Sequence, residues 1–267
     1  MTDRGSCWFG GADRTFISGV VCGQANAWQM RIAYTDKAVI SNNVVQEHAG
    51  FFEAIKFHCS LGPTSPSTQN VCHNMIFSEN VLAKERLNIV SGGIDEGTIQ
   101  DSIFERNLLP GGLVTTNPRN VHRFNVMTEI VLGPRGVDAT MPRGNVFENS
   151  VCMNSSGLRC VNVREGTNAD GLVLRNLLHF ASGASPAEVF GSQGSGSVDQ
   201  AGCVSTLTNP FAVANPSLLV KTDFALPTGS PLIDKGVPIP GRGLDLLGNA
   251  APHGSAPDVG AIEFQSN

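Results

Sequence analysis

The sequence predicts an all-β fold, a single-stranded parallel β-helix of about seven coils that ends in an irregular segment. A phrase of β-prone residues around an Asn recurs through the chain, at Asn43, Asn80, Asn107, Asn149 and Asn176, with a weaker copy at Asn125. Successive Asn positions are 37, 27, 18, 24 and 27 residues apart, a spacing typical of solenoid repeats. The 30 Gly and 15 Pro, with 15% charged residues and no long helical periodicity, agree with this fold.

The recurring Asn is polar where an apolar residue would be expected. If residues 39–45 form one strand, Asn43 lies on the same side as Val39 and Val45. In a β-helix, coils stack about 4.8 Å apart, so that one Asn per coil at the same corner forms a ladder of amide hydrogen bonds. The alternative is that each Asn only marks a turn. We favour the ladder because the flanking residues recur with the Asn.

The strands follow in order along the chain, each supported by a run of β-branched or aromatic residues. We expect them at residues 15–21 and 28–34, 38–46 and 52–59, 71–82 and 87–91, 98–109 and 113–116, 122–132, 146–153 and 158–163, and 171–180 and 187–190. Residues 1–190 form the β-helix. Residues 191–267, which begin with the loop GSQGSGSV and continue Pro-rich, form the last coil and a cap packed on the solenoid in the same domain.

Charge and composition exclude some partners. A formal charge of −5 argues against nucleic acid and anionic membrane surfaces. No apolar run reaches the length of a membrane span, and the first residues do not resemble a signal peptide. The chain is therefore either cytoplasmic or begins after a removed leader or earlier coils. We expect an extracellular or periplasmic location, with the cytoplasm as the alternative.

The seven cysteines are an odd number, so at least one thiol is free in the monomer. Most lie inside strand phrases, where a small apolar side chain fits the interior of a solenoid. We expect buried packing thiols, with one or two disulfides as the alternative. No CxxC pair is present, which argues against a structural zinc site.

The C-terminal region carries three short motifs: GSPLIDKG at 229–236, DLLG at 245–248 and APDVGAIEF at 256–264. They resemble the terminal signature of bacterial right-handed parallel β-helix repeat proteins. The resemblance implies a right-handed β-helix and the activities of that group, which include polysaccharide lyases, glycoside hydrolases, epimerases and secreted proteins. The acidic residues of these motifs lie beside Gly or Pro, where we expect them to accept backbone N–H bonds in turns: Asp234, Asp245, Asp258 and Glu263.

The candidate active site lies in FFEAIKFHCS. With a period of two, Lys56 and His58 share the outer face of this strand, and Arg31 lies on a comparable strand of the preceding coil. We predict Arg31, Lys56 and His58 as catalytic residues. Further polar residues from the same and other coils are predicted to converge on this patch and bind substrate: His48, Glu53, Asp95, Glu96 and Arg164. A solvated structural patch is the alternative. His73 and His122 are interpreted as local hydrogen-bonding residues.

Such a patch suits two reactions. A polysaccharide lyase needs a cation for the uronate carboxylate, a base and a proton donor, for which Arg31, Lys56 and His58 are suited. A glycoside hydrolase needs two carboxylates, for which Glu53, Asp95 and Glu96 are the candidates. We therefore predict an enzyme that cleaves an acidic polysaccharide by β-elimination, with a glycoside hydrolase or a non-catalytic carbohydrate-binding or adhesion module as alternatives.

Calcium is the one cofactor that this function would involve. The chain has no dense DxD or DxN run, so a calcium site would be assembled from different coils. The few Trp and Tyr residues favour a charged sugar over a neutral glucan as substrate. The first coil has only Ser6–Gly11 to cover it, so an association of two copies through this end is a further expectation.

Overall fold

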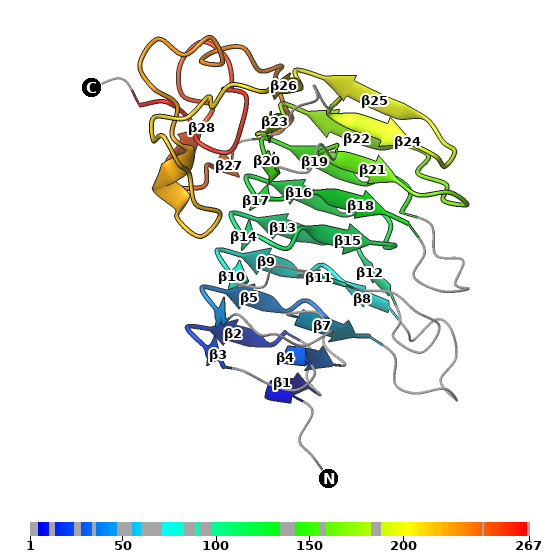
Figure 1. Cartoon of the computed structure of the whole chain (residues 1–267). Coiled ribbons are helices and arrows are strands. Elements are labelled where there is room, and N and C mark those ends of the chain that lie inside the picture. Colours follow the sequence, from blue (N-terminus) through cyan, green and yellow to red (C-terminus); the bar gives the residue numbers. More distant parts are fainter. Residues whose placement is uncertain are drawn as a thin grey trace.

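The computed structural model describes residues 5–10, 14–23, 28–33, 36–46, 55–59, 71–82, 89–90, 98–133, 142–154, 159–182, 188–241 and 243–265. Three parallel sheets of eight strands each run the length of the molecule (Figure 1). The chain visits the sheets in the same order in every coil, so that each coil, or rung, adds one strand to each sheet. This is the parallel β-helix expected from the sequence, with eight rungs rather than about seven.

We name the sheets A, B and C. Sheet A contains β1 (Gly5–Gly10), β4 (Trp28–Ala33), β7 (Ile55–His58), β11 (Ile89–Val90), β15 (Leu113–Thr115), β18 (Ile130–Leu132), β21 (Val161–Val163) and β24 (Phe190–Ser192). Sheet B contains β2 (Phe16–Ser18), β5 (Val39–Ser41), β9 (Ile76–Ser78), β13 (Ile103–Glu105), β16 (Val121–Arg123), β19 (Val146–Glu148), β22 (Leu172–Arg175) and β25 (Val198–Ala201). Sheet C contains β3 (Val21–Cys22), β6 (Val44–Val45), β10 (Val81–Leu82), β14 (Leu108–Leu109), β17 (Val126–Met127), β20 (Val151–Asn154), β23 (Leu178–Ala181) and β26 (Val204–Thr206).

Three smaller elements complete the fold. Strands β8 (Val71–His73) and β12 (Thr98–Gln100) pair in parallel beside sheet B. Strands β27 (Gly243–Leu244) and β28 (Ala250–Ala251) form an antiparallel pair in the C-terminal segment, which also contains the 3₁₀ helix η2 (Lys221–Phe224). No helix among the described residues is long and apolar enough to cross a membrane.

Each strand of sheet B lies between two residues with positive φ. One precedes the strand by about two positions and the other follows it directly, as Asp101 (φ 55°) and Arg106 (φ 56°) do around β13. A left-handed residue bends the chain sharply within a single position, which makes a tight corner. Segments such as 38–46 are therefore two strands with a corner between them, and the prediction that residues 39–45 form one alternating strand is wrong.

The expected asparagine ladder exists at the corner between sheets B and C. The Nδ2 atoms of Asn43, Asn80 and Asn107 donate to the Oδ1 of the Asn in the next rung, at 3.0, 3.1 and 3.0 Å. Each amide also donates to a carbonyl of the preceding rung, and the Oδ1 of Asn80, Asn107 and Asn125 accepts a backbone N–H. The four side chains are at most 1% exposed, so the ladder satisfies buried amides that would otherwise destabilise the fold.

Asn149 and Asn176 do not belong to this ladder, contrary to the pattern in the sequence. Both take the left-handed corner position, with φ of 41° and 53°, one residue before the ladder position, which Ser150 occupies in the sixth rung. Asn176 donates to Asn149 Oδ1 at 3.1 Å and exchanges two hydrogen bonds with the backbone of Val237. The same phrase thus serves two purposes, because a shift of one residue turns the amide from the interior towards the C-terminal segment.

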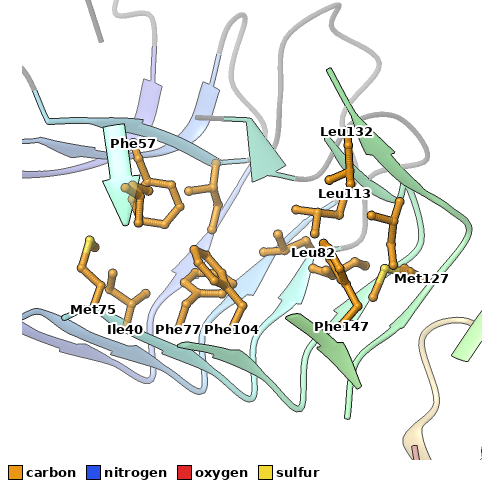
Figure 2. Close-up of a cluster of buried hydrophobic side chains, with 14 of the residues drawn as sticks. Ile40, Phe57, Met75, Phe77, Leu82, Phe104, Leu113, Met127, Leu132 and Phe147 are labelled. Carbon is orange, nitrogen blue, oxygen red and sulfur yellow. The ribbon is translucent and has the colours of Figure 1, made fainter. Parts of the chain in front are cut away.

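The interior is a continuous hydrophobic core (Figure 2). The central residues of the sheet B strands stack in register from rung to rung, among them Phe77, Phe104, His122 and Phe147. The ring of His122 is parallel to those of Phe104 and Phe147, with centroids 4.8 and 4.5 Å away. Its Nε2 has no hydrogen-bond partner among the described residues, so the expectation that His122 is a local hydrogen-bonding residue is wrong: it acts as an aromatic core residue.

Six cysteines form three disulfides, Cys7–Cys22, Cys59–Cys72 and Cys152–Cys160, and Cys203 has a free thiol. The expectation of mainly free packing thiols is wrong, although the odd count did indicate the one free thiol. The bridged residues that the sequence placed in strand phrases do lie in the interior, where side chains from different strands meet. Two of the bridges join sheet A to sheet C, and the third joins the end of β7 to β8.

The C-terminal segment covers the outer face of sheet C from β14 to β23. Leu108, Val126, Val151 and Leu178 stack in register on this face, and the segment buries them under apolar side chains that include Phe211, Phe224, Leu226, Leu246 and Ile262. In Figure 1 the segment, orange to red, lies beside β20 and β23. These four residues are thereby removed from solvent, whereas Val21 in β3, at the far end of sheet C, is 60% exposed.

The acidic residues of the C-terminal motifs bind backbone N–H groups, as expected. Asp234 accepts from Ser255 and Ala256, Asp258 accepts from Asp234, and Asp245 accepts from Leu247 and Asn249. The Oε2 of Glu263 accepts from His253 at 3.1 Å. Three of these carboxyl groups are at most 1% exposed, which raises the pKa of Glu263 to about 7 and that of Asp258 above its usual value.

Candidate functional site on the outer faces of sheets A and B

The predicted catalytic residues lie on two neighbouring strands of sheet A. Arg31 in β4 pairs with Lys56 in β7, and Ala33 pairs with His58, so stacking brings the strand positions of Arg31 and Lys56 together as expected. Met30 and Ile32 are at most 1% exposed, which places Arg31 between them on the outer face. Its guanidinium lies over the ring of Trp8 in β1, 5.0 Å from the ring centroid. The side chains of Lys56 and His58 lie outside the described part of the structure.

Arg164, by contrast, does not join this patch. It follows β21, which is five strands from β4 in sheet A, or about 24 Å at the spacing of β-strands. Its side chain instead lies against Gly133, and its charge opposes the effect of burial, which raises the pKa of Glu129. The predicted convergence is wrong for this residue because too many rungs intervene. His48, Glu53, Asp95 and Glu96 lie outside the described residues.

The outer face of sheet B carries an apolar row. The first residue of most of its strands points outward, since the central residue points into the core. These residues stack in register over seven rungs: Phe16, Val39, Ile76, Ile103, Val121, Val146 and Val173. Phe16 is 70% and Ile76 is 37% exposed, and the other five are partly exposed. An exposed apolar strip of this length, flanked by charged groups, is typical of a binding surface.

A group of charged residues borders this row on one side, at the corner where the chain enters sheet B. We call Asp36, Lys37, His73, Asp101 and Arg119 the ridge cluster. Arg119 donates to both carboxylate oxygens of Asp101, with Nε–Oδ1 at 2.8 Å and Nη2–Oδ2 at 2.9 Å. His73 Nδ1 lies 3.4 Å from Asp101 Oδ2. The three residues thus form an Arg–Asp–His array across adjacent rungs, and each is partly exposed.

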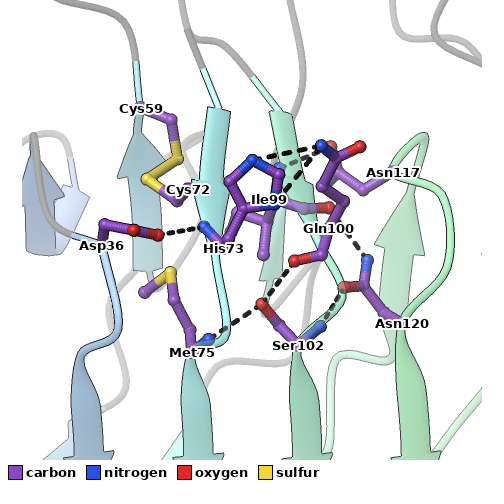
Figure 3. Close-up of a disulfide and its surroundings, with 10 residues drawn as sticks. All are labelled: Asp36, Cys59, Cys72, His73, Met75, Ile99, Gln100, Ser102, Asn117 and Asn120. Carbon is purple, nitrogen blue, oxygen red and sulfur yellow. Dashed lines mark hydrogen bonds between the residues drawn. A yellow bond between two sulfur atoms is a disulfide. The ribbon is translucent and has the colours of Figure 1, made fainter. Parts of the chain in front are cut away.

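The surroundings of His73 hold its ring in place (Figure 3). Its backbone N–H donates to Asp36 Oδ1, and its carbonyl accepts the N–H of Lys37 at 2.9 Å. The side-chain amide of Gln100, its partner in β12, lies 3.4 Å from the ring nitrogens. The adjacent Cys72 is bonded to Cys59, so a disulfide anchors the strand that carries His73.

Electrostatics in the ridge cluster favour an ionised carboxylate. The hydrogen bonds from Arg119 are the main reason that the pKa of Asp101 is below its usual value, and His73 contributes in the same direction. A His–carboxylate pair of this kind is a suitable general base, because the carboxylate orients the ring and compensates the charge that the ring acquires.

The ridge cluster was not found from the sequence as a site. His73 was interpreted as a local hydrogen-bonding residue, which its contacts support, but Asp101 and Arg119 were not singled out. The available signal was their position: Asp101 and Arg119 each lie two residues before the outward residue of a sheet B strand, Ile103 and Val121. Residues at equivalent places in successive phrases become neighbours in a stacked fold.

A charged row borders the apolar row on its other side. Glu105, Arg123, Glu148 and Arg175 stack in register and alternate in sign. Glu105 accepts from Arg106 and Arg123, both at 2.8 Å. Burial raises the pKa of Glu148, and the charges of Arg123 and Arg175 oppose that shift. Glu105 is 8% and Glu148 is 5% exposed.

The C-terminal segment reaches the end of this charged row. Lys221 in η2 is half-buried, and burial is the main reason that its pKa is below the usual value; Glu79 opposes this shift and Arg106 adds to it. Glu79 also accepts from Arg106 Nη2 at 3.1 Å. The segment thus forms a wall beside the outer face of sheet B.

A calcium site is not supported by the described residues. No group of three or more His, Cys, Asp or Glu side chains in this part of the chain is arranged to hold a metal ion. The ridge cluster offers Asp101 and Asp36, but their carboxylates already bind Arg119 and the backbone of His73. We therefore derive no step that involves calcium.

Comparison with known proteins gives no family assignment: no family model matches the chain, and no curated protein matches it.

Proposed function

We propose that the chain binds an extended acidic polysaccharide along the outer face of sheet B and cleaves it by β-elimination. The observation that carries the proposal is the Arg119–Asp101–His73 array beside the apolar row. An apolar strip suits the C–H faces of successive sugar rings, and charged groups on both sides suit their hydroxyl and carboxylate groups. Because the strip runs over seven rungs, it fits a polymer better than a small molecule.

The reaction needs a base, a cation and a proton for the leaving oxygen. In the proposed mechanism, neutral His73 removes the proton from the carbon next to the uronate carboxylate. The electron pair forms a carbon–carbon double bond, the glycosidic C–O bond breaks, and the leaving oxygen takes a proton from the imidazolium or from water. Asp101 stabilises the imidazolium. Arg119 uses two of its five N–H donors on Asp101, so that donors remain for the substrate carboxylate.

The experiment is an ultraviolet assay for the unsaturated product on a panel of uronate polymers, with and without calcium. His73→Ala should lower turnover by about 10²- to 10⁴-fold, the usual contribution of a general base. His253→Ala is the matched control, since His253 is exposed and lies in the C-terminal segment, away from the ridge cluster. Asp101→Asn should also lower turnover, because the charge that orients the His73 ring is lost.

The same assay tests the sequence-predicted residues. Lys56→Ala and His58→Ala should retain activity if His73 is the base. Loss of turnover in these two variants, with His73→Ala unaffected, would move the reaction to sheet A. If the protein binds the polymers but cleaves none of them, the β-elimination proposal is overturned, and the protein is a non-catalytic binding module.

A glycoside hydrolase is the second candidate, and Glu105 and Glu148 favour it. They lie two rungs apart, about 9.6 Å at the strand spacing, near the carboxylate separation of inverting enzymes. The raised pKa of Glu148 suits a general acid, and Glu105 is the second carboxylate of the pair. It ranks second because both carboxylates are nearly buried. Formation of new reducing ends without an unsaturated product would establish hydrolysis, provided that Glu148→Gln abolishes this activity.

An extracellular or periplasmic location forms part of the proposal. Three disulfides are typical of proteins that fold in an oxidising compartment, and an acidic polymer is a substrate found outside the cell membrane. Expression in an oxidising and in a reducing compartment tests this. Equal yields of folded protein without disulfides in the reducing compartment would contradict it.

A further inference from the structure

Trp8 and Arg31 form a distinct feature on the outer face of sheet A, at the first two rungs. They are paired in register between β1 and β4. The guanidinium carbon of Arg31 lies 5.0 Å from the centroid of the Trp8 ring, a cation–π contact. Trp8 is nevertheless 69% exposed. Arg31 covers one face of the Trp8 ring and holds its orientation. The exposed area of Trp8 therefore belongs to the rest of the ring.

The strand that carries Trp8 is anchored on both sides. Cys7, its neighbour, is bonded to Cys22 in β3, so the first rung is cross-linked between sheets A and C. Phe9, on the other side, packs against the hydrophobic core. A large aromatic side chain on an anchored strand loses little conformational entropy when it binds a ligand. This property suits a binding site.

The pair fits one chemical class of ligand. An exposed indole ring stacks on the apolar face of a sugar ring, and a guanidinium binds a carboxylate or sulfate with paired N–H donors. A neutral sugar would use only the ring, and a simple anion would use only the arginine. The combination therefore selects a sugar that carries an anionic group.

We propose that Trp8 and Arg31 form a second binding site, for an anionic sugar unit, separate from the ridge cluster on sheet B. The inference takes its class of ligand from the proposed function but does not require catalysis. Two sites on different faces of one rigid solenoid would hold a long polymer more tightly than a short one, because the second contact is intramolecular.

The fluorescence of Trp8 tests the proposal. The chain has two tryptophans, so Trp28→Phe leaves Trp8 as the only one. In this variant, combined with His73→Ala to prevent turnover, titration with tetragalacturonate should give a saturable change in emission. Arg31→Gln should weaken binding at least tenfold. A neutral tetrasaccharide such as cellotetraose should bind at least tenfold more weakly than the acidic one, and added salt should weaken only the acidic ligand.

A second measurement keeps this result separate from the proposed reaction. Trp8→Ala should leave turnover of short oligomers unchanged and raise KM for long polymers. The binding titration uses a variant without the catalytic base, so that absence of β-elimination would not affect it. An unchanged emission with tetragalacturonate, or equal binding of the neutral sugar, would overturn the second site. A dimer on gel filtration that Trp8→Ala converts to a monomer would instead show that Trp8 joins two copies of the chain, and would overturn it as well.

Discussion

The side-chain oxygen of Asn107 accepts two hydrogen bonds from Asn80 in the preceding rung, one from the backbone N–H at 2.9 Å and one from the side-chain amide at 3.1 Å. Asn107 in turn donates to the carbonyl of Phe77 and to Asn125 Oδ1. One buried side chain therefore binds groups in both the preceding and the following rung, which makes the ladder a cooperative element of the fold.

Asn107→Ala should destabilise the chain strongly. It leaves the buried donors of Asn80 and the carbonyl of Phe77 without these partners, and each unsatisfied buried group costs about 1–3 kcal/mol. We expect the free energy of unfolding to fall by about 3 kcal/mol or more in denaturant titrations. Asn74→Gly is the control: Asn74 is exposed with φ 55°, a conformation that Gly adopts easily, so its effect should stay within about 0.5 kcal/mol. Equal effects of the two changes would refute the ladder.

His122→Phe should stabilise the protein in acid. Burial between Phe104 and Phe147 lowers the pKa of His122 to about 3. The unfolded chain therefore binds a proton below pH 6.5 that the folded chain does not, and the free energy of unfolding falls as the pH drops from 6.5 towards 3. Phe removes this dependence. We expect the advantage of the variant to grow by roughly 3 kcal/mol between pH 7 and pH 4, measured by urea unfolding at both pH values. A constant difference between them would contradict the buried neutral imidazole.

The wild type should lose stability as the pH rises from 4.5 to 7, and Glu263→Gln should not. Burial, reinforced by Asp258 and Asp245, raises the pKa of Glu263 to about 7 against the opposing backbone N–H bonds. The folded chain then binds more protons than the unfolded chain between pH 4.5 and 7, so its free energy of unfolding falls as the pH rises through that window. The wild type should lose about 3 kcal/mol relative to Glu263→Gln between pH 4.5 and 8. Glu165→Gln, a change at an exposed position, should show the same pH dependence as the wild type. If Glu263→Gln also shows that dependence, the Glu263 carboxyl is ionised in the folded chain and the prediction fails.

The disulfide pattern is directly measurable. Without reductant, a thiol titration of the unfolded chain should detect one thiol, that of Cys203, and after reduction all seven. The double change Cys152→Ser and Cys160→Ser should lower stability by about 2–3 kcal/mol, as expected for a short closed loop. Cys203→Ser should have little effect. Three or more thiols before reduction would show that a bridge is absent.

The regular phrases around Asn43, Asn80 and Asn107 were sufficient to predict a stacked parallel β-helix, because a periodic sequence places equivalent residues at equivalent points of each coil. They also predicted the buried amide ladder and the adjacent strands of Arg31 and Lys56. The turn role of Asp245 and Asp258 was predictable as well, since an acidic side chain beside Gly or Pro has nearby backbone N–H groups to bind.

Only the tertiary structure decided which way each residue faces and which rungs are neighbours. A corner of one left-handed residue turns Asn149 outward while Asn125 points inward, although their phrases look alike. Five strand spacings separate Arg31 from Arg164, whereas Asp101 and Arg119 meet because their rungs are adjacent. Side-chain direction depends on where each corner falls, because a shift of one residue at a corner, which the hydrophobic pattern hardly registers, turns a side chain to the other face. The rung of a residue depends on how many strands precede it, which loops of unequal length conceal in the sequence.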